Sequence, residues 1–153
     1  MTAAATTTFT TGHVGLNVSD LSRSIRFYQE VFGFELKGQS DDAKHAYAFL
    51  GTSDALVLTL WQQSKGDFVR DRPGLHHLSF KVPAAADIEQ AHRRAIAAGA
   101  RVHHGGIVPH SEGSASGGLF FEDPDGIRLE IFAAEGAGSA TAPYAHAPTC
   151  GFF

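Results

Sequence analysis

An internal repeat is the feature that most restricts what this chain can fold into. A run of alternating apolar residues begins at His13, and a second begins at His77, 64 positions later (77 − 13 = 64). In each half a helical pattern follows, and then further strand-like runs. Such a duplication predicts an α+β domain of two βαβββ modules, in which a curved, partly open mixed sheet forms a cup with the helices outside. The modules are expected at residues 12–65 and 74–133.

The first repeat carries helix and strand signals in the expected order. Residues 13–18 alternate between apolar and other side chains, which is typical of a strand. Ser19 and Asp20 can cap the helix that follows, and Gly33 suits a left-handed helix end. Further strands are expected at 35–40, 47–50 and 56–61.

The second repeat follows the same order. Residues 75–82 alternate as a strand, Asp87 can cap the next helix, and Gly99 can close it. The stretch from His103 to His110 is rich in glycine and predicts a solvated loop, although a histidine there could also act as a general base. Further strands are expected at 101–104, 119–122 and 127–132.

The two ends of the chain differ in composition from the repeats. Residues 1–11 are rich in Thr and Ala and predict a flexible N-terminus. Residues 134–153 read as a linker with an apolar tail that ends in Phe152 and Phe153. Leaving those rings in water would forgo ~1.5–3 kcal/mol of burial for each. We therefore expect the tail to dock, either on a partner subunit or over the mouth of the cup as a lid; the alternative is a disordered end.

Strand parity indicates a metal site inside the cup. Because side chains alternate along a strand, the apolar positions mark the face that packs on the helices. By this criterion His13, His77 and Glu130 all project from the opposite, cup-facing side. Each residue alone is compatible with the solvated side of a sheet. Two imidazoles and a carboxylate on one face, however, suit a divalent transition metal: Fe, Mn, Ni, Co or Zn.

Three segments carry a resemblance to a known family: HVGLNVSDLSRSIRFYQEVFGFEL, GLHHLSFKV and FFEDPDGIRLEIF. They resemble the vicinal oxygen chelate superfamily of glyoxalases, extradiol dioxygenases and bleomycin resistance proteins, over about residues 12–133. The most specific piece is DPDG followed by three residues and Glu130. The resemblance implies that His13, His77 and Glu130 bind a divalent metal and that the substrate chelates it through vicinal oxygens.

Two departures from the family pattern restrict the expected chemistry. Thr59 stands where glyoxalase I carries a fourth metal ligand, and a neutral hydroxyl is a poor ligand for a divalent ion. Phe120 stands where extradiol dioxygenases carry a tyrosine, and a phenyl ring cannot donate a proton. We therefore expect Lewis-acid chemistry on a small oxygen-rich substrate. The alternatives are an Fe(II)-dependent dioxygenase and a protein that sequesters an antibiotic or toxic metabolite without turnover.

The substrate pocket is expected on the same side of the sheet as the metal. An indole can form the floor of such a pocket, and an arginine could bind a substrate carboxylate or pair with an acid of a partner subunit. The candidate residues are Thr59, Trp61, Phe120, Arg128, Asn17 and His110.

Charge and composition suggest which partners to expect. The net charge is −4 and Lys and Arg do not cluster, which argues against nucleic acid. A run of about 18 apolar residues is lacking, which argues against a membrane span. One cysteine and a beginning unlike a secretory signal favour a cytoplasmic location. From the resemblance we expect a C2 homodimer with shared sites, in which one chain provides His13 and the other His77 and Glu130.

Overall fold

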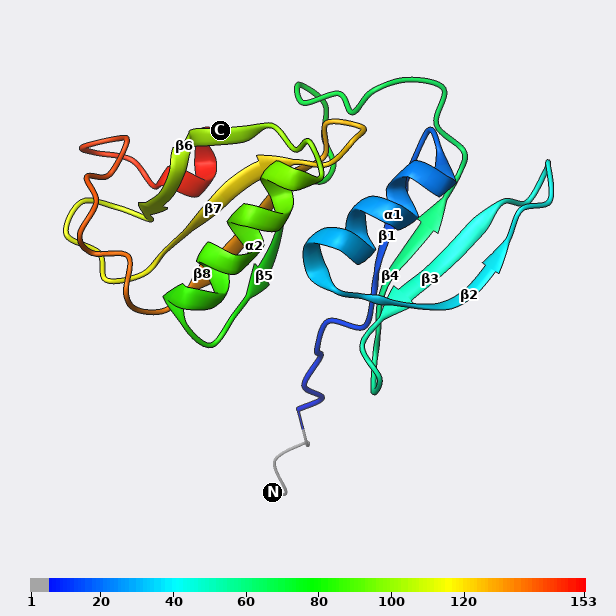
Figure 1. Ribbon diagram of the computed structural model, residues 1–153, viewed down its shortest axis with the longest axis horizontal. Coiled ribbons are helices and arrows are strands. Elements are labelled where there is room, and N and C mark those ends of the chain that lie inside the picture. Colours follow the sequence, from blue (N-terminus) through cyan, green and yellow to red (C-terminus); the bar gives the residue numbers. More distant parts are fainter. Residues whose placement is uncertain (1–5) are drawn as a thin grey trace.

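The structure, a computed structural model, describes residues 6–153, so part of the predicted flexible N-terminus lies outside the described residues. The strands and helices follow one another twice in the same order (Figure 1). The first set is β1 (Val14–Asn17), α1 (Leu21–Phe32), β2 (Glu35–Ser40), β3 (Tyr47–Gly51) and β4 (Leu56–Trp61). The second is β5 (Leu78–Lys81), α2 (Ala85–Ala97), β6 (Val102–Pro109), β7 (Gly117–Glu122) and β8 (Arg128–Ala133), followed by a short 3-10 helix (Thr149–Gly151).

The two sets form two sheets of identical topology. Strand order is β1-β4-β3-β2 in the first sheet and β5-β8-β7-β6 in the second. In each sheet the first strand pairs in parallel with the fourth, and the other pairs are antiparallel. The strands β1 and β5 begin 64 residues apart (78 − 14), as do the two helices (85 − 21). The predicted duplication of a βαβββ module, and the α+β class, are therefore confirmed.

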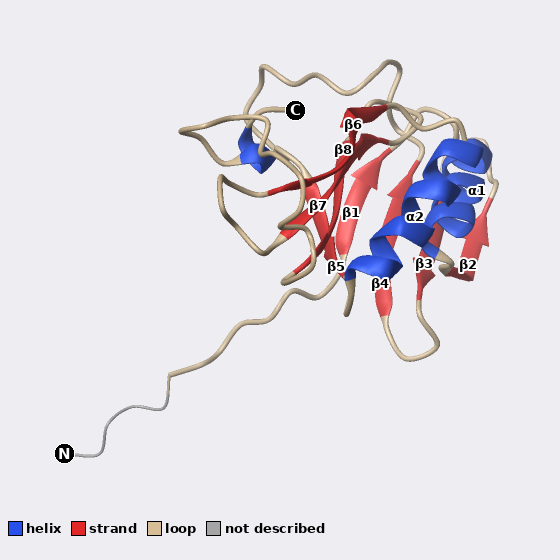
Figure 2. Cartoon of the chain, turned by 60° about the vertical axis from the view of Figure 1, so that its left-hand side comes forward, coloured by secondary structure: helices blue, strands red, loops and turns tan. Residues whose placement is uncertain are grey.

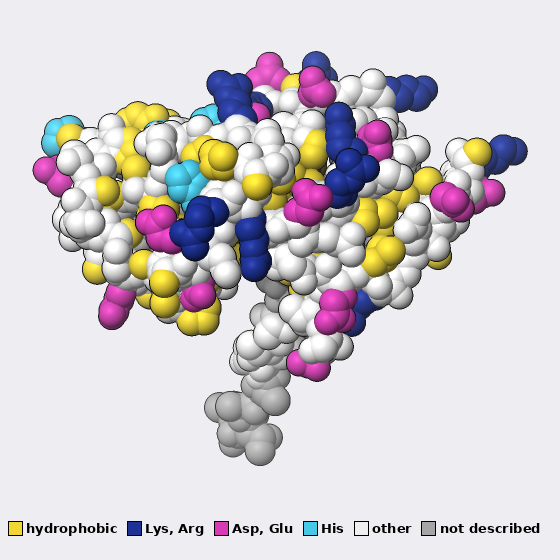
Figure 3. All heavy atoms as spheres, viewed as in Figure 1, with side chains coloured by type: hydrophobic (Ala, Val, Ile, Leu, Met, Phe, Trp, Pro, Cys, Tyr) yellow, Lys and Arg dark blue, Asp and Glu magenta, His cyan; other side chains and the backbone are white. Residues whose placement is uncertain are grey.

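Both helices lie on the same side of the molecule. Figure 2 shows α1 and α2 side by side, with the sheets behind them. Helix α1 packs on the first sheet and α2 on the second, and the helices also contact one another. The side of each sheet that faces away from its helix is the cup-facing side, on which strand parity placed His13, His77 and Glu130. No helix in the described part of the chain is long and apolar enough to span a membrane. On the face drawn in Figure 3, acidic and basic side chains are interspersed.

The helix ends agree with the predictions except at one cap. The side chain of Asp20 accepts a hydrogen bond from the Arg23 N–H at the start of α1, and Gly33 closes that helix with φ 71°. The prediction that Asp87 caps α2 was wrong, because the cap is Ala84. The Asp87 carboxylate lies within the first turn and accepts the Ala84 N–H at 3.1 Å. From this third helical position it satisfies the unpaired N–H of the cap residue, whereas a capping side chain would accept an N–H of the first turn.

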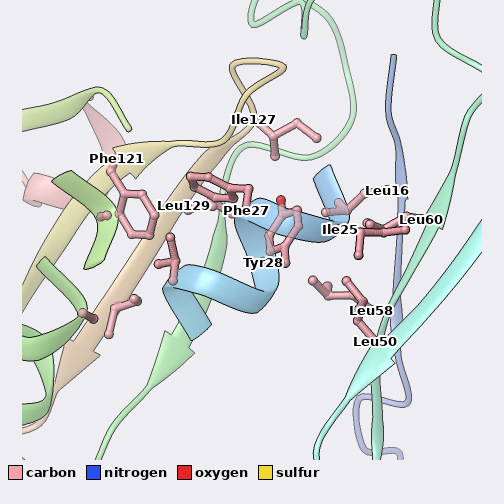
Figure 4. Close-up of a cluster of buried hydrophobic side chains, with 14 of the residues drawn as sticks. Leu16, Ile25, Phe27, Tyr28, Leu50, Leu58, Leu60, Phe121, Ile127 and Leu129 are labelled. Atoms are coloured by element: carbon pink, nitrogen blue, oxygen red, sulfur yellow. The ribbon is translucent and has the colours of Figure 1, made fainter. Parts of the chain in front are cut away.

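A shared hydrophobic core joins the two modules through α1. Figure 4 shows Phe27 and Tyr28 on this helix, between the leucines of the first sheet and Phe121 of the second. The Phe27 and Phe121 ring centroids are 6.4 Å apart, and Tyr28 is fully buried. Leu58 and Leu60 are also fully buried beneath α1, as their parity predicts. Burial of this kind fixes which side of each strand is left for the cup.

The DPDG turn between β7 and β8 also fastens the modules together. Asp125 accepts hydrogen bonds from the backbone N–H of Ser19, at 3.0 Å, and from its hydroxyl, and it pairs with Arg23 at 2.9 Å. Asp123 accepts the Tyr28 hydroxyl at 2.9 Å, together with backbone N–H groups of its own turn. The acidic residues of this motif therefore connect the second sheet to α1 of the first module.

The buried Asp123 predicts a pH dependence of stability. Burial raises its pKa from 3.8 to about 6, against the hydrogen bonds from Ile127, Tyr28 and Asp125. Between these values the unfolded chain loses a proton that the folded protein retains. The free energy of unfolding should therefore fall, by on the order of 3 kcal/mol, as the pH rises from about 4 to about 6. Urea denaturation across this range should show the fall, and Asp123→Asn should lack this part of it. Parallel curves for the two proteins would contradict the assignment.

His103 and His104 belong to β6, in agreement with the strand expected at 101–104. The loop predicted up to His110 was wrong, because the same strand continues to Pro109. Pairing with β7 is interrupted between Val102 and Ile107, where His104, Gly105 and Gly106 have φ of 57°, 74° and 149°. The glycines that suggested a loop instead make a bulge inside a strand, a role that only the partner strand reveals. His110 directly follows the strand and is partly buried.

Candidate functional site

The duplication places Thr59 and Glu130 at equivalent positions. Thr59 lies opposite Gly15 in the β1–β4 pair, and Glu130 lies opposite Ser79 in the β5–β8 pair. Gly15 and Ser79 are themselves 64 residues apart, the shift of the repeat. Each module thus has one polar residue at the same cup-facing position of its fourth strand. Only that of the second module is a carboxylate.

The Glu130 carboxylate lies between two histidines. The residue is 4% exposed. Its Oε1 lies 2.6 Å from Nε2 of His110, and its Oε2 lies 3.2 Å from Nε2 of His77. An ionised carboxylate can only accept, so the His110 nitrogen donates. The other ring nitrogen of His110 lies 2.8 Å from the Ser116 hydroxyl, which holds the imidazole in place.

This setting keeps Glu130 ionised despite its burial. Burial acts to raise the pKa of the carboxyl, but hydrogen bonds from His110 and Ser79 and the charges of His110 and His77 act more strongly in the opposite direction. The pKa therefore lies below the ordinary value of 4.5. An ionised carboxylate beside an imidazole nitrogen is a donor pair suited to a divalent transition metal.

His13 does not join this pair within one chain. It is exposed and directly precedes β1 in the first module. Among residues 6–153, no group of three or more His, Cys, Asp and Glu side chains is placed to hold a metal ion. The structure therefore brings together two of the three predicted ligands, His77 and Glu130. It adds His110, which the sequence suggested as a pocket residue or a general base rather than as a partner of Glu130.

The tail of the chain packs on the cup-facing side of the second module. The Phe153 ring lies 4.8 Å from that of Phe120, 5.7 Å from that of His77 and 5.5 Å from that of His103, measured between centroids. Phe120 is fully buried and Phe153 is 9% exposed. Of the two places predicted for the tail, the structure has it over the cup-facing side of its own chain.

Arg128 contacts the tail as well. Its Nη1 donates to the Phe153 carbonyl at 2.8 Å and its Nε to the His76 carbonyl at 2.9 Å. The guanidinium carbon is 5.8 Å from the centroid of the Phe153 ring. Two of its donors are therefore bound to backbone oxygens rather than left for a substrate carboxylate.

The tail is held by polar contacts before it reaches Phe153. Thr149 is fully buried, with its N–H donating to the His110 carbonyl at 2.8 Å and its hydroxyl to the Pro109 carbonyl at 2.6 Å. The Tyr144 hydroxyl donates to the Phe152 carbonyl at 2.8 Å. Residues that read as linker therefore run along the edge of the second module.

The remaining predicted pocket residues lie on the first module. Thr59 is buried and accepts the indole N–H of Trp61 at 3.0 Å, and Trp61 is 37% exposed. Asn17 accepts the Gln63 N–H through its side-chain oxygen. Sequence reasoning did not select Tyr47 and Phe49, which surround the indole. The same strand parity could have found them, since Ala48 and Leu50 take the packed face.

A second ionic cluster, also not predicted, surrounds Glu122 at the end of β7. The carboxylate pairs with Arg70, and it lies 2.8 Å from His103 Nε2 and 3.9 Å from Arg101. Burial acts to raise the pKa of Glu122, but hydrogen bonds from His103 and Arg70 lower it overall. The cluster fastens the segment between the modules, through Arg70, to the second sheet.

Comparison with known proteins agrees with this architecture of paired βαβββ modules. The family described as "Glyoxalase/Bleomycin resistance protein/Dioxygenase superfamily" matches residues 10–131. The chain therefore belongs to that superfamily, as the sequence motifs had suggested.

Individual relatives differ in their named activities. A lactoylglutathione lyase of Salmonella typhimurium is 30% identical over 136 residues, covering 82% of this chain and 93% of the relative. A solved glyoxalase/bleomycin resistance protein/dioxygenase domain from Frankia sp. EAN1pec is 28% identical, with a TM-score of 0.70, covering 84% of this chain and all of that one. A fosfomycin resistance protein, FosX, of Listeria monocytogenes shares the fold at 17% identity and a TM-score of 0.65, covering 84% and 94%. That structure is a mutant complexed with Mn(II) and 1S,2S-dihydroxypropylphosphonic acid.

Proposed function

We propose that this protein is a metal-dependent enzyme that acts on a small oxygen-rich substrate. The observation that carries the proposal is the buried, ionised Glu130 carboxylate with Nε2 of His77 3.2 Å from one of its oxygens. His77 and Glu130 would hold a divalent transition metal from this module. His110 would remain bonded to the other carboxylate oxygen and orient it, as residues behind metal ligands commonly do.

The third ligand in this proposal is His13 of a second copy of the chain. Within one chain His13 does not join His77 and Glu130 in a group able to bind metal, among the residues described. A C2 homodimer can place the first module of one chain against the second module of the other, and symmetry then makes two equivalent sites. With His110 kept behind the carboxylate, this pairing supplies the second histidine ligand, so that His13, His77 and Glu130 form a 2-His-1-carboxylate set.

The proposed chemistry follows from the neutral counterpart of Glu130. A bound divalent ion would supply Lewis-acid polarisation of a substrate oxygen. The first module contributes Thr59 at the equivalent position, and its oxygen already accepts the Trp61 N–H. A hydroxyl used in this way offers neither a further charged ligand nor a carboxylate base. We therefore do not propose efficient isomerisation of hemithioacetals. Because Phe120 has no hydroxyl to donate a proton, we do not propose catechol cleavage either.

Metal content and turnover test the proposal directly. Purified protein loaded with Fe(II), Mn(II), Ni(II) or Zn(II) should retain about one ion per chain after desalting. Glu130→Gln should weaken retention by at least ~100-fold, because it replaces a ligand rather than a supporting group. A mutation at the equivalent position, Thr59→Val, should leave retention unchanged. Failure to retain any of the four ions would contradict the metal dependence. Turnover of hemithioacetal or catechol with kcat/KM above ~10⁴ M⁻¹s⁻¹ would contradict the proposed chemistry.

A further inference from the structure

Three aromatic side chains lie together on the cup-facing side of the first module. Tyr47 and Trp61 are directly opposite one another on β3 and β4, and Phe49 follows two positions after Tyr47. The Tyr47 ring centroid is 4.9 Å from that of Phe49 and 5.7 Å from that of Trp61, and the last two are 6.2 Å apart. We call Tyr47, Phe49 and Trp61 the aromatic shelf. None of the three takes part in the proposed metal site.

The indole of the shelf is held in one orientation. Its N–H donates to the hydroxyl of Thr59, which is 3% exposed. The only polar atom of the Trp61 side chain is therefore satisfied within the sheet, and what remains exposed is ring surface. A ring fixed in this way loses little conformational entropy when another ring stacks on it.

Glycines on both flanking strands let the rings lie close to the backbone. A Cβ at Gly15 of β1 would come within 3.3 Å of Thr59 Oγ1 and 3.5 Å of Trp61 Nε1. A Cβ at Gly38 of β2 would come within 3.4 Å of the Phe49 ring. A side chain at either position would press on the shelf or cover its edge. Bare backbone therefore flanks the shelf at these two glycines, while Asn17 lies opposite Trp61 and Ser40 opposite Tyr47.

We infer that the aromatic shelf binds the planar aromatic ring of a small-molecule ligand. Aromatic rings attract one another in offset or edge-to-face arrangements beyond their area of burial. Trp61 is 37% exposed and the other two rings are half-buried, so the shelf exposes on the order of 200 Å² if each side chain has ~150–250 Å² in total. A stable protein interface needs roughly 800 Å² from each partner. The shelf is therefore of the size of a ligand ring rather than of a subunit.

For the proposed enzyme, the substrate class is then a molecule with a planar aromatic ring. The inference rests on the proposed function in one respect, which is that the ligand binds on the cup-facing side. In the proposed dimer the ring would lie on the first module of one chain, and the oxygen atoms of the same molecule would face the metal-binding residues of the other chain's second module.

Because Trp61 is the only tryptophan of the chain, a single label reports on the shelf. Protein labelled with 5-fluorotryptophan gives one ¹⁹F resonance, which we would follow while adding 2-naphthol or its saturated counterpart, decahydro-2-naphthol. We expect a saturable shift with 2-naphthol and at least tenfold weaker binding of the saturated alcohol. Tyr47→Leu and Phe49→Leu should each weaken 2-naphthol binding about tenfold, whereas Phe152→Leu, an exposed phenylalanine elsewhere, should not.

The outcomes that would overturn the inference are equally specific. Equal affinity for the two alcohols would show an unspecific apolar surface, and the lack of any shift would show no site. A resonance that moves on dilution of the protein alone would show that a second copy covers the shelf. The comparison of alcohols uses unmutated protein, so a misfolded variant cannot decide it. Measuring metal retention on the same unmutated protein separates the two proposals. Protein that retains metal but does not bind 2-naphthol overturns the shelf alone, and protein that binds 2-naphthol but retains no metal overturns the proposed function alone.

Discussion

A heterodimer of one His13→Ala chain and one Glu130→Gln chain should bind about half as much metal as the unmutated dimer. If each site takes His13 from one chain and His77 and Glu130 from the other, such a heterodimer has one site with all three ligands and one lacking two of them. Each mutant alone has only damaged sites. The two chains can be co-expressed with different affinity tags, the heterodimer isolated through both tags, and its metal measured by elemental analysis.

The matched control combines His77→Ala with Glu130→Gln. Both residues belong to the second module, so each site of this heterodimer lacks one ligand and neither recovers metal. A His13→Ala/Glu130→Gln heterodimer that binds no more metal than this control would show that the ligands come from one chain. That result would refute the shared site. Whether His77 and Glu130 are ligands would still be decided by the metal content of the single mutants.

The second large effect is expected in the tail. Phe153→Ala should lower the free energy of unfolding by ~3–5 kcal/mol, the range of buried phenylalanines, because the ring packs on Phe120 and His103. The neighbouring Phe152→Ala should change it by no more than about 0.5 kcal/mol, because that side chain is 54% exposed. Urea denaturation followed by circular dichroism measures both values.

Hydrogen exchange distinguishes a docked tail from a general loss of stability. The Thr149 N–H donates to the His110 carbonyl only while the tail is docked. In Phe153→Ala this amide should exchange much faster, whereas amides of α1 should change only with the global stability. Equal effects of the two phenylalanine substitutions on stability would contradict the docked position of Phe153.

Docking of the tail also bears on Arg128. Sequence parity correctly places this residue in the β8 strand, on the face opposite Leu129. Its guanidinium nevertheless lies against the Phe153 ring and the carbonyls of His76 and Phe153. A substrate carboxylate would have to compete with these contacts for the guanidinium.

Much of the fold could be derived from the sequence because it depends on local periodicity. The alternation around Leu58 and Leu60 determines that Thr59 faces the cup, and the structure buries both leucines fully under α1. Asp20 and Gly33 mark the ends of α1 through groups that lie within one turn of the helix. The 64-residue shift then transfers the same arrangement to the second module.

What only the tertiary structure decided depends on contacts between residues far apart in the chain. His110 reaches the Glu130 carboxylate because the strand before it contains a bulge. From the sequence alone the glycines at 105 and 106 indicate a loop, and only the pairing with β7 shows that they form a bulge. Phe153 covers the same face because Thr149 is bonded to the end of β6, although the composition of the tail is that of a linker. The separation of His13 from Glu130 in one chain is likewise a matter of how two modules pack, and strand parity carries no information about that distance.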